Sequence, residues 1–544
     1  MVVTVDKTDV PAVLDTAHVG DIKGAFGTIR LGAEAPRAGL KARLMTLLAI
    51  VGPGLIVMTG DNDAGAFSTY AQAGQNYGTS LLWVLLLLIP VLYVNQGMVL
   101  RLGAVSGVGH ARLILERFGK FWGAFSVIDL FILNALTIVT EFIGISQGLD
   151  YLGLPKVAGV LLAAVAIVGA ASTGSFQRFE RVCMALVAGS LLLVPIFVMV
   201  HPPLTTMGRD FFVPHMPAGA DLTGVVLLII AIIGTTVAPW QLFFQQSYVI
   251  DKRITPRFIK YEKIDLWLGI VIVIVGAAAI IGFTAATFAG RPEFGHFTSA
   301  GDVAAGLGKY VGKAAGVLFA LALIDASIIG AAAVGLSTSY ALGDTLGLRH
   351  SLHRKIRDAK GFYLVFCGIL VSSAIVVLIP GSPLGLLTVG VQVLAGVLLP
   401  SATVFLLLLC NDREVLGPWV NGPAMNAFTS FIIAVLVVLS LVLTAGVLFP
   451  DMGSAAIVRI LVAGAVASAV AGAGLLALRR LRPRPALPAI DKAERATWRM
   501  PPLALLGAPR LSAESRIGLA VLRFYLLIAM ILVCVRIYQL ALGH

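Results

Sequence analysis

The chain has 544 residues, of which 58% are hydrophobic and 12% are charged, and its mean hydropathy is +0.95. Soluble globular chains carry about 25% charged residues, so the composition excludes a soluble enzyme, a disordered protein and a secreted disulfide-rich protein. The long apolar runs also exclude a membrane β-barrel, in which apolar and polar residues alternate. The remaining class is a polytopic α-helical membrane protein.

The formal net charge of +12 indicates membrane topology, because the basic residues gather in loops between apolar runs. No nucleic-acid partner is expected, and the basic loops are expected to face anionic lipid. The four cysteines (Cys183, Cys367, Cys410 and Cys534) form no CxxC pair. Neither a disulfide nor a thiolate metal site is therefore expected.

Residues 1–44 are expected to form a cytoplasmic tail, because they lack the apolar core of a signal peptide. A core of ten spans is expected over 45–410, since a membrane-crossing helix needs about 20 apolar residues. Two accessory spans fill 411–480 and a basic linker covers 481–516. The C-terminal helix 517–544, apolar over 517–542, is expected to span the membrane or to lie in its interface. The twelve expected spans are 46–74, 79–100, 121–148, 156–174, 181–200, 221–250, 262–289, 313–343, 361–380, 384–410, 424–449 and 454–478.

The basic residues in the loops predict the orientation of the protein in the membrane. With the N-terminus inside, the inner loops hold 17 Lys and Arg and the outer loops hold 5. Cytoplasmic loops carry an excess of basic residues, so both flanks of the twelve spans are expected in the cytoplasm, across a bacterial inner (plasma) membrane. The inner residues lie within 101–120, 178–181, 252–263 and 349–360 and at Arg413, and the outer ones are Lys156, Arg209, Arg291, Lys309 and Lys313.

Two spans are interrupted in the middle. The first carries Gly-Asp-Asn-Asp-Ala-Gly at 60–65, and the sixth carries Gly-Thr-Thr-Val-Ala-Pro-Trp-Gln at 234–241. Proline breaks the helical hydrogen-bond ladder, and free carbonyls at membrane depth are tolerated only inside protein or along a cavity. Two breaks five spans apart predict an all-α fold with an inverted repeat of five plus five helices, and a substrate held between broken helices 1 and 6.

The first break carries two acids that no nearby base neutralises. Asp61 and Asp63 lie in the stretch from Ala49 to Leu87, which contains no Lys or Arg. A charge at this depth is costly unless it faces a polar cavity, so the two carboxylates predict a cation. Carboxylate, amide and carbonyl oxygens suit Mg²⁺, Ca²⁺ and Mn²⁺, and neither break contains Cys or His. Because Mg²⁺ keeps several waters, the expected site is hard, acidic and roomy.

Other polar residues inside the spans leave alternatives open. Glu141 in the third span is a proton relay or a structural carboxylate, and Asp325 in the eighth span is similar. Gln392 in the tenth span either reaches a central cavity or bonds a neighbouring helix.

Residues in the first and sixth spans resemble the motifs of a known family. Gly52-Pro53-Gly54, the broken segment and Gln72-Ala73-Gly74 are similar to the first helix of the Nramp divalent-metal transporters, and Leu242 and Phe243 fit their sixth helix. The resemblance covers about 45–410. It implies a LeuT-type fold with alternating access and import of a divalent metal, usually with protons. The metal is then a transported substrate, and neither a cofactor nor an enzymatic activity is expected.

The resemblance assigns metal ligands residue by residue. The family's first break reads Asp-Pro-Gly-Asn and this chain has Asp-Ala-Gly-Ala at 63–66, so the aspartate is kept as Asp63 and the asparagine is lost. The sixth-helix motif Met-Pro-His-Asn is here Ala-Pro-Trp-Gln at 238–241, without the sulfur ligand. A carbonyl ligand three residues earlier falls on Thr235, and the tenth-helix glutamine matches Gln392.

The family's proton machinery is largely absent. Glu141 is kept in the third helix, but Ile138 replaces an aspartate, and Trp240 and Gln245 replace the two histidines of the sixth helix. The ninth span has no arginine between Lys360 and Pro380. These losses are similar to those of the Nramp-related magnesium transporters, which move Mg²⁺ and Mn²⁺ without evident proton coupling.

The protein is therefore expected to be a monomer that takes up Mg²⁺ without coupling to protons. Mn²⁺ is expected as a second substrate. Three alternatives stay open: a proton-coupled Mn²⁺/Fe²⁺ importer that uses Glu141, a sodium-coupled organic-solute symporter on the same fold, and a sensor that has lost transport. The expected contributors to the metal site are the side chains of Asp61, Asn62, Asp63, Gln241 and Gln392 and the carbonyls near Gly60, Thr235 and Ala238.

Overall fold

The computed structural model describes residues 17–33, 37–217, 219–379, 384–449, 453–481 and 493–507 and the positions 509, 518–520, 522 and 524. Within these residues the chain is helical, apart from one antiparallel hairpin made by β1 (Ile22–Gly24) and β2 (Gly27–Ile29). The all-α membrane fold is confirmed. The apolar run predicted at 517–542 lies largely outside the described residues.

Ten described helical stretches are long and apolar enough to cross a membrane, or eleven when the bent pair α1 (Leu40–Ile50) and α2 (Pro53–Gly60) is counted as one. The fourth predicted span is α7 (Lys156–Ala171), which is apolar but has only 16 residues. The other spans are α4 (Leu82–Ser106), α6 (Lys120–Tyr151), α8 with α9 (Phe176–Gly189, Leu193–Val200), α11 with α12 (Leu222–Thr236, Pro239–Asp251), α13 (Ile259–Phe288), α15 (Lys313–Leu346), α16 (Lys360–Leu378), α17 (Leu384–Cys410), α19 (Pro423–Leu448) and α20 (Ser454–Leu481).

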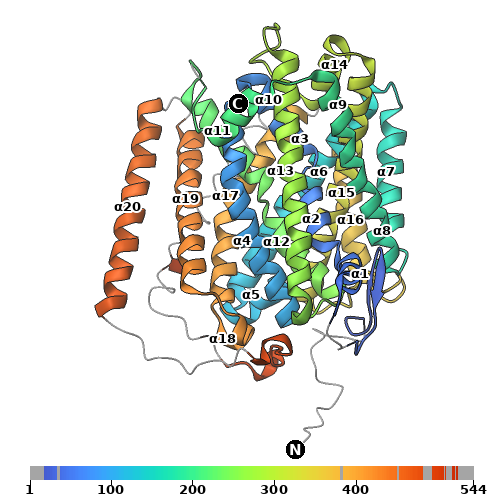
Figure 1. Ribbon diagram of the computed structural model, residues 1–544, viewed down its shortest axis with the longest axis vertical. Helices are drawn as coiled ribbons and strands as arrows, with labels where there is room; N and C mark the ends of the chain where they lie inside the picture. The colour runs from blue at the N-terminus through green and yellow to red at the C-terminus, as the bar shows by residue number, and fades with distance from the viewer. Residues whose placement is uncertain are drawn as a thin grey trace, which may run out of the picture.

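The core of the bundle forms around the broken first span. Helix α13 packs along both α2 and α3 (Ala64–Tyr77), while α15 packs along α6. Helices α19 and α20 lie at one side of the bundle (Figure 1). The side chains of Val462 and Val470 on α20 are 57% and 66% exposed, as expected of a helix that borders lipid.

Short helices cap the two ends of the bundle, and the apolar pattern did not predict them. Helices α10 (Leu204–Phe212) and α14 (Ala300–Tyr310) lie at one end (Figure 1). Helices α5 (His110–Phe118) and α18 (Arg413–Leu416) lie at the opposite end, together with the β1–β2 hairpin. We call this second end the basic end, because it also carries the Arg- and Lys-rich loops.

The described part of the predicted N-terminal tail is folded onto the basic end. The Arg253 guanidinium donates hydrogen bonds to the Ala17 carbonyl at 2.7 Å and to the Asp21 carbonyl at 3.1 Å. The His18 Nε2 atom lies 3.7 Å from Asp251 Oδ1. Residues 17–21 therefore form a strap across the end of α12.

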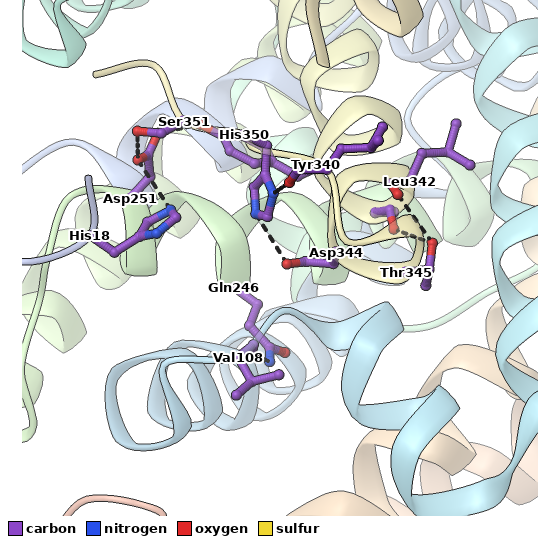
Figure 2. A network of polar contacts seen from close by, with 12 residues as sticks. His18, Val108, Gln246, Asp251, Tyr340, Leu342, Asp344, Thr345, His350 and Ser351 are labelled. Atoms are coloured by element: carbon purple, nitrogen blue, oxygen red, sulfur yellow. Dashed lines mark hydrogen bonds and ion pairs between the residues drawn. The ribbon is translucent and has the colours of Figure 1, made fainter. Parts of the chain in front are cut away.

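Beneath this strap lies a polar network around Asp251 (Figure 2). The Asp251 carboxylate accepts hydrogen bonds from the Tyr340 hydroxyl at 2.6 Å and the Ser351 hydroxyl at 2.5 Å. Close by, His350 Nε2 lies 3.1 Å from Asp344 Oδ1. Burial disfavours the imidazolium form, but the Asp344 carboxylate outweighs it and raises the pKa of His350 to about 9. His350 is therefore charged at neutral pH and forms an ion pair with Asp344.

The described part of the predicted basic linker, 493–507, also packs on the basic end. The Arg117 guanidinium donates to the Gly507 carbonyl at 2.6 Å, and the Trp419 indole donates to the Arg495 carbonyl at 2.8 Å. The Met500 N–H donates to the Val105 carbonyl on α4 at 3.3 Å. Segments from both ends of the chain thus cover the same end of the bundle.

Candidate metal-binding site

The first break separates α2 from α3 at Asp61, Asn62 and Asp63. Asp63 caps α3, and its Oδ1 atom accepts a hydrogen bond from the Ala66 N–H at 2.8 Å. The Ala64 N–H donates to Glu141 Oε2 at 3.1 Å instead of to the Gly60 carbonyl, its helical partner. The carbonyl of Gly60 is thereby released from the helix ladder.

The second break separates α11 from α12 at Val237 and Ala238. Pro239 begins α12 and has no N–H, so the carbonyl of Thr235 lacks its helical donor. The Thr235 hydroxyl is buried and makes no hydrogen bond. Both predicted breaks are confirmed, and each one leaves backbone oxygen unpaired within its helix.

Three carboxylates are buried at or beside the first break. Asp61 and Glu141 are 0% exposed and Asp63 is 3% exposed. A Cβ atom at Gly330 would lie 2.8 Å from Glu141 Oε2 and 3.0 Å from Asp63 Cβ, so both acids approach that glycine. Both oxygens of Asp61 and Oε1 of Glu141 make no hydrogen bond.

Within the part of the chain that the structure describes, no base pairs with this acidic group. Among the described residues, none of the ion pairs includes Asp61, Asp63 or Glu141. A buried charge is costly unless it is paired or coordinates a cation. The break is therefore suited to receive a positive ion.

Gln392 on α17 reaches the first break. A Cβ atom at Gly65 would overlap Gln392 Nε2 and would lie 3.2 Å from Asp63 Oδ1, so a glycine at this position allows the amide to approach. Gln392 Nε2 makes no hydrogen bond. Of the two alternatives for Gln392, the structure favours the one in which its side chain faces the break.

Gln241 on α12 is held by a residue that the sequence did not single out. Its Oε1 atom accepts a hydrogen bond from Gln96 Nε2 on α4 at 2.8 Å, and its Nε2 atom lies 3.5 Å from the Thr236 carbonyl. The buried amide pair Asn95-Gln96 in the middle of the second span was the available signal. Gln241 also lies beside the Asp61 carboxylate.

The side chains of Asn62 and Asp325 contact helices α13 and α8. The Asn62 Nδ2 atom donates to the Val273 carbonyl on α13 at 3.3 Å, while its Oδ1 atom makes no hydrogen bond. Asp325 lies against Gly189 of α8. Asp325 is thus outside the group of acids at the breaks.

The remaining positions that distinguish this chain from the family motif are also buried. Ala238 is 5% exposed and Trp240 is 1% exposed, and the Trp240 carbonyl accepts a hydrogen bond from the Ser337 hydroxyl at 3.0 Å. Tyr70 on α3 and Thr236 on α11 are hydrogen-bonded through their hydroxyl groups at 2.7 Å, which joins the two broken spans. The acids are therefore enclosed by protein.

The donor types at the breaks define what they can bind. Over the described ranges, no three His, Cys, Asp or Glu side chains converge on a single metal position. A bound ion would therefore need amide, backbone-carbonyl or water ligands in addition to the aspartates. Mg²⁺, which is commonly held by one or two carboxylates and retained water, fits such a site.

Comparison with known proteins agrees with this geometry. The sequence profile of Nramp, described as natural resistance-associated macrophage protein-like, matches residues 54–446. The divalent metal cation transporter MntH of Ralstonia nicotianae is 30% identical over 423 residues, which is 73% of this chain and 90% of the relative. MntH of Burkholderia ambifaria is 28% identical over 416 residues, which is 72% of this chain and 87% of the relative.

Two solved structures share the fold. The Eremococcus coleocola manganese transporter, in complex with an aromatic bis-isothiourea compound, has a TM-score of 0.60 at 20% identity, over 82% of this chain and 97% of that chain. A Na⁺-coupled sialic acid symporter in a substrate-bound outward-open state has a TM-score of 0.50 at 14% identity, over 77% and 89%. The predicted LeuT-type fold with broken helices 1 and 6 is confirmed.

Proposed function

We propose a substrate and a mode of transport from one premise: the chain belongs to the Nramp family and is a multi-pass divalent metal cation transporter. It is a transporter rather than an enzyme, and the metal is its substrate rather than its cofactor. The proposed substrate is Mg²⁺, with Mn²⁺ as a second ion. The proposed mode is alternating access without proton coupling.

The observation that carries the Mg²⁺ proposal is the oxygen-only donor set around buried, unpaired carboxylates. Asp61 makes no hydrogen bond or ion pair within the described residues, and Ala238 stands where the family motif has a thioether. A thioether favours softer metals over Mg²⁺. Its absence therefore leaves a site whose donors suit a hard ion.

The proposed ligands act in two groups. Asp61 and Asp63 supply negative charge, and the amides of Gln241 and Gln392 orient the ion or its waters. The backbone carbonyls of Gly60, Thr235 and Ala238 supply further oxygen, and Asn62 contributes through its unbonded Oδ1 atom.

Uncoupled transport is supported by the side chains that replace the family's proton-carrying residues. Trp240 and Gln245 are buried and cannot carry a proton as histidine does, and Ile138 cannot replace an aspartate. A membrane potential supplies about 2.3 kcal/mol per charge per 100 mV. A divalent cation is therefore driven inward without a proton.

We place the basic end in the cytoplasm, because it carries the excess of Lys and Arg. The N-terminal strap is then cytoplasmic, in a bacterial inner membrane. We expect a monomer in contact with membrane lipid.

A second candidate is a proton-coupled Mn²⁺/Fe²⁺ importer. It is supported by Glu141, which lies beside Asp63. Glu141 accepts a hydrogen bond from the Ala64 N–H through one oxygen, and its other oxygen has no partner among the described residues. Such a carboxyl group is placed to exchange a proton with the site.

Flux into proteoliposomes at a fixed potential separates the two candidates, with Mg²⁺, Mn²⁺ and pH dyes read in parallel. We expect saturable Mg²⁺ entry without acidification of the lumen. Mn²⁺ entry with acidification and without Mg²⁺ flux would instead establish the coupled importer. Movement of neither ion would exclude both and favour a sodium-coupled solute or a role without transport.

A further inference from the structure

A second group of buried charges lies at the basic end, apart from the two breaks. It consists of Glu180 on α8, Lys252 on α12, and Glu262 and Asp265 on α13. None of these residues is more than 1% exposed. The sequence predicted Lys252 in a solvated basic loop facing lipid, and this was wrong, because its ammonium group is enclosed by protein.

This group holds the bend between α1 and α2. Lys252 Nζ lies 2.7 Å from Glu180 Oε1 and donates to the Ile50 carbonyl at 2.6 Å and the Val51 carbonyl at 2.9 Å. On the other side of the bend, Asp265 Oδ2 accepts a hydrogen bond from the Gly54 N–H at 2.6 Å. The bend cannot move without breaking these charge-assisted hydrogen bonds.

The β1–β2 hairpin covers the group from outside. The Ala25 N–H donates to Glu180 Oε2 at 2.5 Å, and the Ala25 carbonyl accepts from Arg181 Nε at 3.0 Å. The Gln177 amide donates to the Gly24 carbonyl at 2.9 Å. The hairpin therefore separates the carboxylates from water in this conformation.

The charges inside this enclosure do not balance. Three carboxylates share one ammonium group, and neither oxygen of Glu262 has a hydrogen-bond partner among the described residues. The charged groups that act on Glu262 are Asp265, three residues further along the same helix, Lys252 and Glu180. The hairpin, α1 and α2 contribute the backbone contacts described above, and Cys183 and Tyr248 lie near Glu180. An uncompensated buried carboxylate costs several kcal/mol.

We infer that Glu262 is a proton-binding site that takes up one proton when α1, α2 and the hairpin close over it, and releases that proton when this end opens to water. The ligand is a proton rather than a metal ion, because the Lys252 ammonium already lies within this group and would repel a divalent cation. A proton needs only one carboxylate oxygen, and Glu262 has two that are unbonded.

This proton does not drive transport. It enters and leaves on the same side of the membrane, so the site is compatible with uncoupled flux. Because the closed form holds the proton, a lower cytoplasmic pH stabilises the closed form and slows release of the ion. The inference rests on the alternating-access part of the proposed function and is independent of which divalent ion is carried.

The first test is infrared spectroscopy of the full-length protein in lipid, which detects the C=O stretch of protonated carboxyl groups without requiring transport. We expect Glu262→Gln to remove one such band, Glu262→Asp to restore a shifted band, and the matched surface control Glu116→Gln to leave the spectrum unchanged. A band pattern that Glu262→Gln leaves intact would overturn the inference. Should Glu262→Gln not fold, the wild type and Glu262→Asp still decide the test, since the band must shift between them.

The second test is initial Mn²⁺ and Mg²⁺ flux at cytoplasmic-face pH 6, 7 and 8. We expect the wild-type rate to rise with pH by up to about tenfold per unit, the limit for one proton, and Glu262→Gln to give a slow and flat profile. An equal slope in both proteins would contradict the role of Glu262. Loss of Mg²⁺ flux alone in the wild type would count against the proposed substrate and would leave the Mn²⁺ profile to test the proton site.

Discussion

Two groups of three buried carboxylates can be compared within this one molecule. Asp61, Asp63 and Glu141 are buried at or beside the first break, and none of them is in an ion pair of the described residues. Glu180, Glu262 and Asp265 meet at the basic end, where Lys252 supplies one positive charge. Both groups are enclosed, but within the part of the chain that the structure describes only the group at the basic end contains its own cation.

The difference indicates what each group is for. A group with an internal ammonium can hold two helices together in a closed state, because the ammonium compensates part of its charge and the inferred proton on Glu262 compensates a further part. The group at the break has to be compensated by a cation that arrives and leaves. We therefore assign ion binding to the break in the proposed mechanism, and closure of the transport path to the basic end.

The largest effect is expected from Asp63→Ala at the break. The change removes an uncompensated charge, so Mg²⁺ uptake into proteoliposomes should fall to background while the protein stays folded. Asp150→Ala, at an exposed position at the end of α6, is the matched control and should keep the wild-type rate. Wild-type uptake by a folded Asp63→Ala protein would place the ion elsewhere.

Lys252→Met tests the group of buried charges at the basic end. Removal of the only ammonium leaves Glu180 buried without its partner, which costs about 3–5 kcal/mol, so the Tm should drop sharply. Adding Glu180→Gln should recover part of the loss. An unchanged Tm in the single variant would mean that the ion pair does not hold the basic end.

Ala238→Met sharpens the comparison by changing the chemistry of the break without changing its charge. A thioether beside the aspartates should lower the Mg²⁺/Cd²⁺ ratio of initial rates severalfold, since sulfur favours softer metals. Ala238→Leu fills similar space without sulfur and is the control. Equal ratios in the two variants would show that this position does not face the ion.

The smallest effect is expected at the margin of the basic end, from His350→Gln. The folded-state pKa of His350 is raised to about 9 from the ordinary 6.5, so its ion pair with Asp344 adds stability that is complete below about pH 6.5 and is lost as the pH rises through 9. The Tm difference between wild type and variant should therefore shrink between these two values. A difference that grows with pH would contradict the assignment.

The sequence alone predicted the breaks well, because their signals are local. Pro239 removes a donor wherever it lies in a helix, and adjacent aspartates in an apolar run require an explanation without reference to any other segment. The match of the sixth- and tenth-helix motifs then placed Gln241 and Gln392 near these aspartates. Each of these steps used residues a few positions apart.

The basic end could not be predicted in this way, because its contacts join distant segments. Glu180 bonds Ala25 across 155 positions, and Lys252 bonds Ile50 across 202. Along the sequence, Glu262 and Lys252 have the pattern of solvated residues at the ends of spans. Similarly, the amide pair Asn95-Gln96 indicated a polar contact in the second span but not that Gln241 would be the partner, because that contact crosses 145 positions.

The strap over the basic end also constrains the order of folding. Ala17 and Asp21 leave the ribosome early, yet their partner Arg253 follows 236 and 232 positions later. Ala17 and Asp21 therefore wait through the synthesis of six spans before Arg253, their docking partner, exists. Closing so long a loop is among the slower steps of folding, so a segment that is made before the six spans is among the last to reach its native place.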